Sequence, residues 1–344
     1  MRHLAGIALT STLLLSGCSG GSPESTSASQ AAATQLTVIV NDSFTLPDEL
    51  KEAFEQQSGY QVTYLQPDSS MSLVNQLILT KDSPLGDVVF GIDTTSSARA
   101  LTEGIVTDFV SAKLSDPAPN LEPQPGLTPI DYGDVCINAD SVWFTQHNLA
   151  IPETLDDLTK PEYRDLLVVT SPATSTPGMA LLAATVGEQG EHWLDYWKAL
   201  DENGMKVTSG WTEAYYTDFS GADGKGPRPL VLSYASSPAY TVDGDSSTTV
   251  ALLDTCLRQV EYAGVLSGAK NEAGAQAFVD FLVSAEVQAV IPENMYMYPA
   301  LASARLPADW VKFAPVPLEP IYVSAQEIGN NRDAWLRQWT DQQG

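Results

Sequence analysis

Residues 36–91 decide the fold, because three short apolar runs alternate there with two segments of helical spacing. The apolar runs are LTVIV at 36–40, VTYL at 62–65 and DVVFG at 87–91, and the helical segments are PDELKEAFEQQ at 47–57 and SLVNQLILT at 72–80. This alternation predicts a parallel sheet with helices on its faces. Ligands of such sheets bind at the carboxyl ends of the strands. The polar residues expected at those ends are Asn41, Asp42, Ser43, Asp68, Ser69 and Asp93.

A second α/β unit begins with the apolar run at 166–170. The segment SPATSTPG at 171–178 follows it, and then a long helical pattern at 179–200. Thr176 before Pro177 predicts an N-cap with proline at the first helical position. Free N–H groups and the positive dipole end of that helix are typical of an anion site, although plain capping without a ligand explains the same residues. The candidate anion-site residues are Ser175, Thr176 and Gly178.

The segments TSGWTEAYY at 208–216 and LVLSYASSPAY at 230–240 place five aromatic residues among small and hydroxyl residues. Flat rings with hydroxyl groups favour a planar heterocycle, and the electron-rich face of a ring favours a cation. Core packing is the alternative for each ring. The aromatic ligand-site candidates are Trp211, Tyr234 and Tyr240, with Tyr296 from the aromatic segment at 292–299.

The N-terminus has the features of a secretory signal at residues 1–17, with Arg2 before a short apolar run. The ending Leu-Ser-Gly-Cys at 15–18 resembles a bacterial lipobox, which implies cleavage before Cys18 and lipidation of its sulfur. An ordinary signal followed by a chance cysteine is the alternative. Residues 18–34 are rich in Ser, Ala, Gly and Thr and predict a flexible tether. We therefore expect a lipid-anchored protein on the extracytoplasmic face of the cell membrane, in the periplasm or at the cell surface.

Length, charge and cysteine content further limit the class of protein to which the chain can belong. A chain of 344 residues is too long for one small core and predicts two lobes. The formal net charge of −26 argues against nucleic-acid binding, which needs a basic surface. Cys136 and Cys256 remain once Cys18 is lipidated. In an oxidising compartment they predict a disulfide, with two separate buried thiols as the alternative.

Taken in order, these segments resemble the thiamine-binding subunits of bacterial ABC importers, which are two-lobed periplasmic binding proteins. The similarity runs from about Leu36 to Trp339. The most specific shared segments are 42–44, 72–77, 131–133, 174–178, 210–215, 232–234, 237–240, 291–292, 297–299 and 334–335.

The resemblance implies a type II fold of two α/β lobes, each a mostly parallel sheet flanked by helices. We expect the first lobe at 35–130 plus 262–344 and the second at 131–261. Two extended segments, near 131–138 and 258–262, are expected to cross between the lobes.

The resemblance also implies residue roles. Trp211, Tyr234 and Tyr240 match positions that line the thiamine pocket, Ser175 matches a position near the phosphate of thiamine phosphate, and Asp68 or Ser69 matches a polar contact. The chain departs from the family at two positions, since Asn41 stands where a tyrosine is common and Tyr296 where a tryptophan is common.

The function implied is capture of thiamine, with thiamine phosphates as further candidate ligands, and delivery to a membrane permease with a cytoplasmic ATPase. We expect a monomer that needs no cofactor or metal and performs no catalysis. Two alternatives keep a related fold. One is a ferric-ion-binding protein that uses the Tyr215–Tyr216 pair, although His147 and His192 lie outside the shared segments. The other is a thiamine-degrading enzyme with Cys136 as the nucleophile, activated by Glu213 or Glu261.

Overall fold

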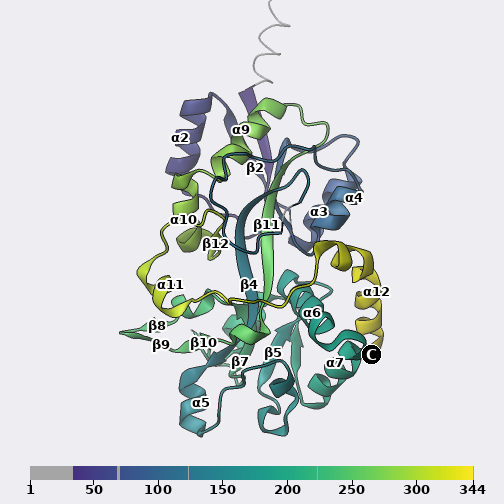
Figure 1. Cartoon of the computed structure of the whole chain (residues 1–344), viewed down its shortest axis with the longest axis vertical. Coiled ribbons are helices and arrows are strands. Elements are labelled where there is room, and N and C mark those ends of the chain that lie inside the picture. Colours follow the sequence, from purple (N-terminus) through teal and green to yellow (C-terminus); the bar gives the residue numbers. More distant parts are fainter. Residues whose placement is uncertain (1–33, 68–69, 123, 223, 344) are drawn as a thin grey trace, which may run out of the picture.

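The computed structural model describes residues 34–67, 70–122, 124–222 and 224–343, without the side chains of residues 70 and 71. The expected signal peptide, Cys18, most of the tether, and the candidates Asp68 and Ser69 lie outside the described residues. The described chain forms two α/β lobes, one above the other in Figure 1, and the strands β4 (Thr128–Asp140) and β11 (Leu257–Val265) run through both.

One ten-stranded sheet extends through both lobes, with its main strands in the order β2-β1-β3-β11-β4-β7-β5-β6. In the first lobe, β1 (Gln35–Ile39) pairs in parallel with β2 (Gln61–Leu65) on one side and β3 (Val88–Asp93) on the other. The intervening helices are α2 (Asp48–Ser58), α3 (Ser70–Leu79) and, after β3, α4 (Ser97–Thr102). All six residues of β3 are buried, as expected for a strand in a parallel sheet covered on both faces. The predicted α/β alternation is therefore present.

The two crossing strands pair with each other in antiparallel orientation, and the predicted crossing segments lie within them. Two bonds join them near the lobe junction. Cys136 of β4 forms a disulfide with Cys256, and their Cα atoms are 4.2 Å apart. Two residues away from each cysteine, Arg258 donates from Nε and Nη2 to the two carboxylate oxygens of Asp134, each at 2.9 Å. Of the two interpretations of the cysteines, the structure contains the disulfide.

The second lobe continues the sheet from β4. Strand β7 (Leu230–Tyr234) pairs antiparallel with β4 and parallel with β5 (Leu167–Thr170), which pairs in parallel with β6 (Lys206–Thr208). The single helix predicted at 179–200 is wrong: the structure has α6 (Thr176–Gln189) and α7 (Trp193–Glu202), separated by a 3₁₀ turn. Gly190 ends α6 with a φ of 53°, a conformation that glycine adopts without steric cost.

Shorter elements complete this lobe. They are α5 (Ser141–His147), α8 (Trp211–Glu213), a π-helical turn (Ala214–Asp218), 3₁₀ turns (Asp156–Thr159, Pro161–Tyr163, Gly190–His192, Ser237–Ala239, Leu253–Thr255), the hairpin β8 (Val242–Asp243) and β9 (Ser246–Ser247), and β10 (Thr249–Ala251). Strand β10 pairs with the end of β4, so the segment that leads back to β11 also belongs to the sheet.

After β11 the chain returns to the first lobe. Helices α9 (Glu272–Leu282) and α10 (Ala285–Met295) pack Phe278 and Val287 into the core that also holds Val38 and Phe90. Strand β12 (Tyr298–Pro299) pairs with β4, and α11 (Ala308–Phe313) follows.

The last helix, α12 (Ala325–Gln343), departs from the expectation that all of 262–344 belongs to the first lobe. It packs against α4 of the first lobe and α7 of the second. The ring of Trp339 meets that of Trp197 edge to face, with centroids 5.7 Å apart, and both belong to the second-lobe core. Burial of two tryptophans explains why this amphipathic helix lies across the junction.

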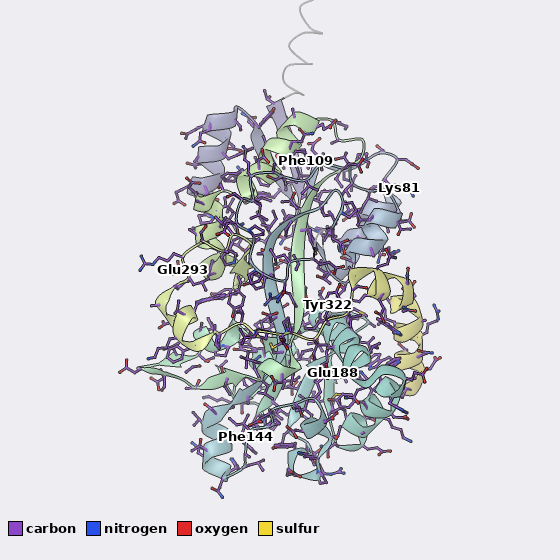
Figure 2. All side chains as sticks on the ribbon, viewed as in Figure 1. Lys81, Phe109, Phe144, Glu188, Glu293 and Tyr322 are labelled. Carbon is purple, nitrogen blue, oxygen red and sulfur yellow. A yellow bond between two sulfur atoms is a disulfide. The ribbon has the colours of Figure 1, made fainter. Side chains whose placement is uncertain are left out.

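A third segment, 314–324, therefore connects the lobes. Its Ile321 N–H donates to the carbonyl of Cys256 at 2.8 Å, and Figure 2 shows Tyr322 on it, between the two lobes. Among the described residues no single helix is long and apolar enough to cross a membrane, whereas α9 and α10, bent by 70°, meet that length and composition test only as a pair.

Candidate ligand-binding site

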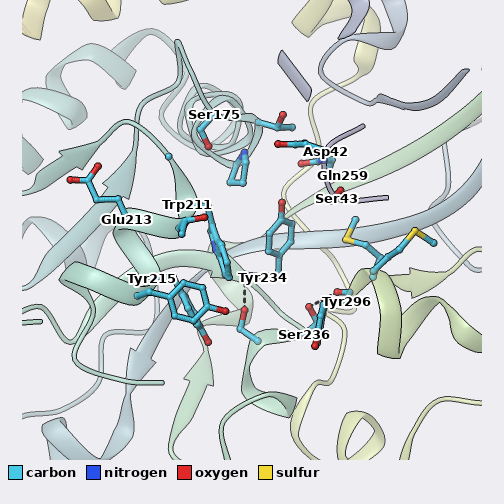
Figure 3. Close-up of a pocket in the computed structure, with 18 of the residues that line it drawn as sticks. Asp42, Ser43, Ser175, Trp211, Glu213, Tyr215, Tyr234, Ser236, Gln259 and Tyr296 are labelled. Carbon is cyan, nitrogen blue, oxygen red and sulfur yellow. Dashed lines mark hydrogen bonds between the residues drawn. The ribbon is translucent and has the colours of Figure 1, made fainter. Parts of the chain in front are cut away.

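A cavity of about 910 Å³ lies between the lobes, within the size range of small-molecule sites. Its wall combines the loop after β1 and the end of α10 from the first lobe with α6, α8 and the end of β7 from the second. In Figure 3, Trp211 and Tyr234 lie near the centre, Glu213 at one side, and Asp42, Ser43 and Gln259 at the other. The predicted site residues that line it are Ser43, Ser175, Thr176, Trp211, Tyr234, Tyr240 and Tyr296.

The Trp211 ring is held in place from two sides. It stacks on Tyr215, with centroids 4.6 Å apart and planes at 17°, and its Nε1–H donates to Ser233 Oγ at 3.0 Å. Ser233 Oγ in turn lies 2.7 Å from Ser237 Oγ, within hydrogen-bond distance. Tyr215 is 1% exposed and supports the ring from the core. The face of an indole fixed in this way is a prepared stacking surface for a flat ligand.

Tyr240 and Tyr296 meet across the cavity mouth. Their rings pack edge to face with centroids 5.9 Å apart, and both side chains are about half exposed, at 48% and 52%. Ser236 Oγ donates to the Tyr296 carbonyl at 2.9 Å and joins the second lobe to the first. Tyr296 ends α10 with a φ of 56°, which is uncommon for a bulky residue and typical of functional sites.

The N-terminus of α6 faces the cavity, but its cap differs from the prediction. Ser175, rather than Thr176, is the N-cap: its Oγ accepts from the Gly178 N–H at 3.5 Å and donates to Thr170 Oγ1 at 2.9 Å. Gly178 does not line the cavity. A Cβ there would lie 2.5 Å from the Thr170 carbonyl oxygen, so this glycine permits the close packing of α6 on the end of β5.

Asp93 is also absent from the described cavity wall. Its carboxylate is buried and accepts hydrogen bonds from Thr95 Oγ1 and Ser96 Oγ, each at 2.8 Å. It thereby organises the turn between β3 and α4. The turn that it stabilises places the carboxylate beneath the surface, so Asp93 does not line the cavity as expected.

Asp42 lines the cavity at a strand end where ligands were expected, whereas Gln259, Glu261, Met295 and Met297 line it without having been predicted to contact a ligand. Gln259 and Glu261 lie on β11, a run that predicted a crossing strand, and Glu261 was a candidate only as the activating acid of the enzyme alternative. Their spacing of two residues places both on one face of the strand, and this alternation was the signal available in the sequence. Met295 and Met297 flank Tyr296, where only the aromatic ring drew attention.

Acidic side chains dominate the charge of the site. Asp42, Glu213 and Glu261 line the cavity. Behind it, Asp93, Glu261 and Asp131 lie side by side on β3, β11 and β4, because Glu261 is in register with each of the other two. We call these three residues the acid row. Burial, together with the charge of Asp93, raises the pKa of Glu261 to about 7. Burial and the neighbouring Glu261 raise the pKa of Asp131 well above its usual value.

The two alternative functions receive no support from the site. Tyr215 and Tyr216 are perpendicular, with Tyr215 buried beneath Trp211, and the described residues contain no group of three or more His, Cys, Asp or Glu side chains that could hold a metal. His147 stacks on Trp143 in α5, away from the cavity. Cys136 is bonded to Cys256, and a disulfide sulfur carries no thiolate to act as the expected nucleophile.

Two α/β lobes joined by crossing strands, with a ligand-sized cavity between them, are the architecture of solute-binding proteins. Residues 83–316 match the family of bacterial extracellular solute-binding proteins, and the chain belongs to this family. It therefore acts on the extracytoplasmic side of the membrane as the binding component of an importer.

Individual relatives show which solute-binding proteins the chain resembles. The chain is 29% identical over 321 residues to the thiamine-binding periplasmic protein of Brucella suis biovar 1 (strain 1330). The matched region covers 91% of this chain and 92% of the relative. A solved periplasmic thiamin binding protein has a TM-score of 0.78 and 28% identity, covering 90% of this chain and 96% of that one. The ferric binding protein from Campylobacter jejuni has a TM-score of 0.72, but at 16% identity the likeness shows the fold alone.

Proposed function

We propose that this protein captures thiamine for an ABC importer. The observation that carries the proposal is the cavity wall, which combines fixed and exposed aromatic rings with carboxyl groups. Thiamine is a permanent cation with two flat rings, so its chemistry complements both features. The similarity to thiamine-binding proteins over nine-tenths of the chain supports the same ligand.

The physical basis of capture is stacking and charge attraction in a site closed to water. A desolvated cation–π contact contributes about 2 kcal/mol, and Trp211, Tyr234, Tyr240 and Tyr296 provide the rings. Closure of the lobes brings Tyr240 and Tyr296 together over the ligand and strengthens the attraction of the carboxyl groups, because water is excluded. We propose no catalytic step, cofactor or metal.

Phosphorylated thiamine is a second form to consider. Ser175 and Thr176 line the cavity at the N-terminus of α6, where a phosphate on the ligand would meet the positive end of the helix dipole. The carboxyl groups elsewhere in the cavity oppose the phosphate charge. We therefore propose that thiamine is the principal ligand, and that a phosphate group on the ligand adds affinity only through its contact with the N-terminus of α6.

Delivery completes the proposal. We propose that the closed, loaded protein docks as a monomer on a membrane permease driven by a cytoplasmic ATPase. A lipid on Cys18 and the tether at 18–34 would hold the protein close to that permease and raise its local concentration.

Native mass spectrometry of the purified protein tests the ligand directly. We expect a bound species heavier than the protein by the mass of thiamine, which disappears after unfolding and refolding and returns when thiamine is added. Refolded protein that stays ligand-free with thiamine in excess would contradict the proposal.

A further inference from the structure

We propose that Glu261 and Asp131 share one proton in the empty cleft and release it to solvent when a cation occupies the cavity. Cation capture is then coupled to proton release. This inference deepens the proposed function, on which it rests, because it requires a positively charged ligand.

The geometry of the sheet places the two carboxyl groups together. Glu261 of β11 is directly in register with Asp131 of β4 and, on its other side, with Asp93 of β3. Asp131 is fully buried and Glu261 is 7% exposed, yet Glu261 lines the cavity. Glu261 is therefore the member of the acid row that lines the cavity, and Asp131 lies beside it on the neighbouring strand.

The hydrogen bonds show that this pair needs a proton. Asn41 Nδ2 donates to Glu261 Oε1 at 2.9 Å, whereas neither carboxylate oxygen of Asp131 has a donor among the described residues. Two carboxylates repel each other and have no hydrogen between them, but one protonated carboxyl donates to the other. A single shared proton therefore satisfies both groups.

A second observation concerns an acceptor on the cavity wall beside Glu261. Gln259, also on β11, lines the cavity and is 2% exposed, and its Oε1 has no donor in the described part of the chain. A buried amide carbonyl without a donor costs free energy, and a ligand N–H or O–H would satisfy it. Gln259 and Glu261 therefore present oxygen atoms to the cavity that can accept hydrogen bonds from a ligand and stabilise its positive charge.

The surrounding charges favour retention of the proton while the cleft is empty. Glu261 interacts electrostatically with three groups, which are Asp93 from β3, Asp42 from the loop after β1 and the Tyr234 phenol from β7. The two acids among them repel a second negative charge on the pair. Arg332 of α12 is the cation nearby, and its field acts on Asp93. These groups and burial raise the pKa of Glu261 to about 7, and burial with the charge of Glu261 raises the pKa of Asp131 well above its usual value, so the pair retains at least one proton near neutral pH.

A ligand cation reverses this balance. Positive charge beside Glu261 favours the ionised form of the pair, so the charge of the pair changes from −1 to −2 and one proton leaves to water. The site gains one positive charge from the ligand and loses one as the proton. Affinity for the cation must consequently increase with pH over the range in which the pair is protonated.

Calorimetry measures the released proton. Ligand-free protein is titrated with thiamine at pH 6.5 in two buffers that differ in ionisation enthalpy, with heats of ligand dilution subtracted. We expect the observed enthalpy to differ between the buffers by an amount equivalent to release of up to about one proton, and affinity to increase by up to about tenfold per pH unit below pH 7. Glu261→Gln should bind thiamine with a buffer-independent enthalpy and a flat pH profile.

Two further variants separate the pair from general electrostatics. Asp131→Asn gives Glu261 an amide donor in place of the shared proton, so proton release should also be lost. Asp42→Asn removes a cavity carboxylate that is exposed and outside the acid row, so thiamine should bind more weakly while proton release persists. Thiamine binding by the wild type with no buffer dependence overturns the coupling and leaves the proposed function intact, whereas no binding of thiamine by the wild type overturns both.

Discussion

Arg258 and Asp134 form a bidentate ion pair between the two crossing strands, and both are almost completely buried. The guanidinium also donates to the Pro119 carbonyl at 2.9 Å and lies 4.4 Å from the centroid of the Tyr132 ring. Each of the three guanidinium nitrogens therefore has an acceptor, and each carboxylate oxygen of Asp134 has a donor. Such a pair fixes the register of β4 and β11 at the point where the lobes meet.

Removal of one partner leaves the other charge buried. We expect Arg258→Ala to lower the free energy of unfolding by about 3–5 kcal/mol, measured by urea denaturation. The double variant Arg258→Met with Asp134→Leu should recover much of this loss, since it buries no unpaired charge. A loss below about 1 kcal/mol, the range of an exposed ion pair, would show that water reaches Asp134.

The Cys136–Cys256 disulfide should stabilise the fold without controlling the site. It closes a chain segment with a sequence separation of 120 residues and is buried. We expect Cys136→Ser with Cys256→Ser to lose about 2–5 kcal/mol of unfolding free energy. Thiamine affinity of the folded variant should stay within a few-fold of the wild type, as measured by calorimetry, and a loss of binding in the folded variant would contradict this separation.

Ser175 has a capping role and a place in the cavity wall, and the two are separable. We expect Ser175→Ala to cost about 1 kcal/mol of stability through the lost N-cap. It should weaken thiamine phosphate and leave thiamine unchanged, because only the phosphate faces α6. Ser284→Ala is the matched control, since Ser284 caps α10 by accepting from the Val287 N–H and does not line the cavity. Equal weakening of both ligands by Ser175→Ala would assign Ser175 to lobe closure instead.

The ligand-free protein should lose stability as pH rises towards neutrality. The pKa of Glu261 is about 7 in the folded protein, above the ordinary value of 4.5 that applies to the unfolded chain. Between these values the folded state binds more protons, so this contribution to stability is fully present below about pH 4.5 and is lost as pH rises through about 7. Urea midpoints at several pH values should show this decline in the wild type and a smaller one in Glu261→Gln. Parallel profiles would indicate that Glu261 ionises normally.

The sequence predicted much of the sheet and cavity because period-two and helical patterns report burial directly. The strands near 36–40, 62–65 and 87–91 were predicted in this way, whereas Trp211, Tyr234 and Tyr240 were predicted from the clustering of rings among hydroxyl residues and from the family resemblance. The acid row was not, because register across β3, β11 and β4 is a tertiary property that no local pattern encodes. Asp93 and Gly178, which do not line the cavity, were chosen for a related reason. A polar residue at a strand end and a glycine at a helix start have the same local signature whether they serve a ligand or the backbone.

Local sequence patterns likewise could not predict which lobe α12 packs against. Its tryptophans predict an amphipathic helix, but the choice of core depends on which lobe leaves a hydrophobic surface uncovered. Trp197 of α7 provides that surface in the second lobe.

We propose that a prepared aromatic surface captures thiamine, and Trp211 is the ring of that surface that is held by both a stacking contact and a hydrogen bond. Calorimetric titration of ligand-free wild type and Trp211→Ala with thiamine tests it most directly, with Trp143→Phe in α5, away from the cavity, as the control. We expect one thiamine per wild-type chain, the same affinity in Trp143→Phe, and at least about tenfold weaker binding in Trp211→Ala, since a desolvated cation–π contact contributes about 2 kcal/mol. Equal thiamine affinity in Trp211→Ala and wild type would contradict it.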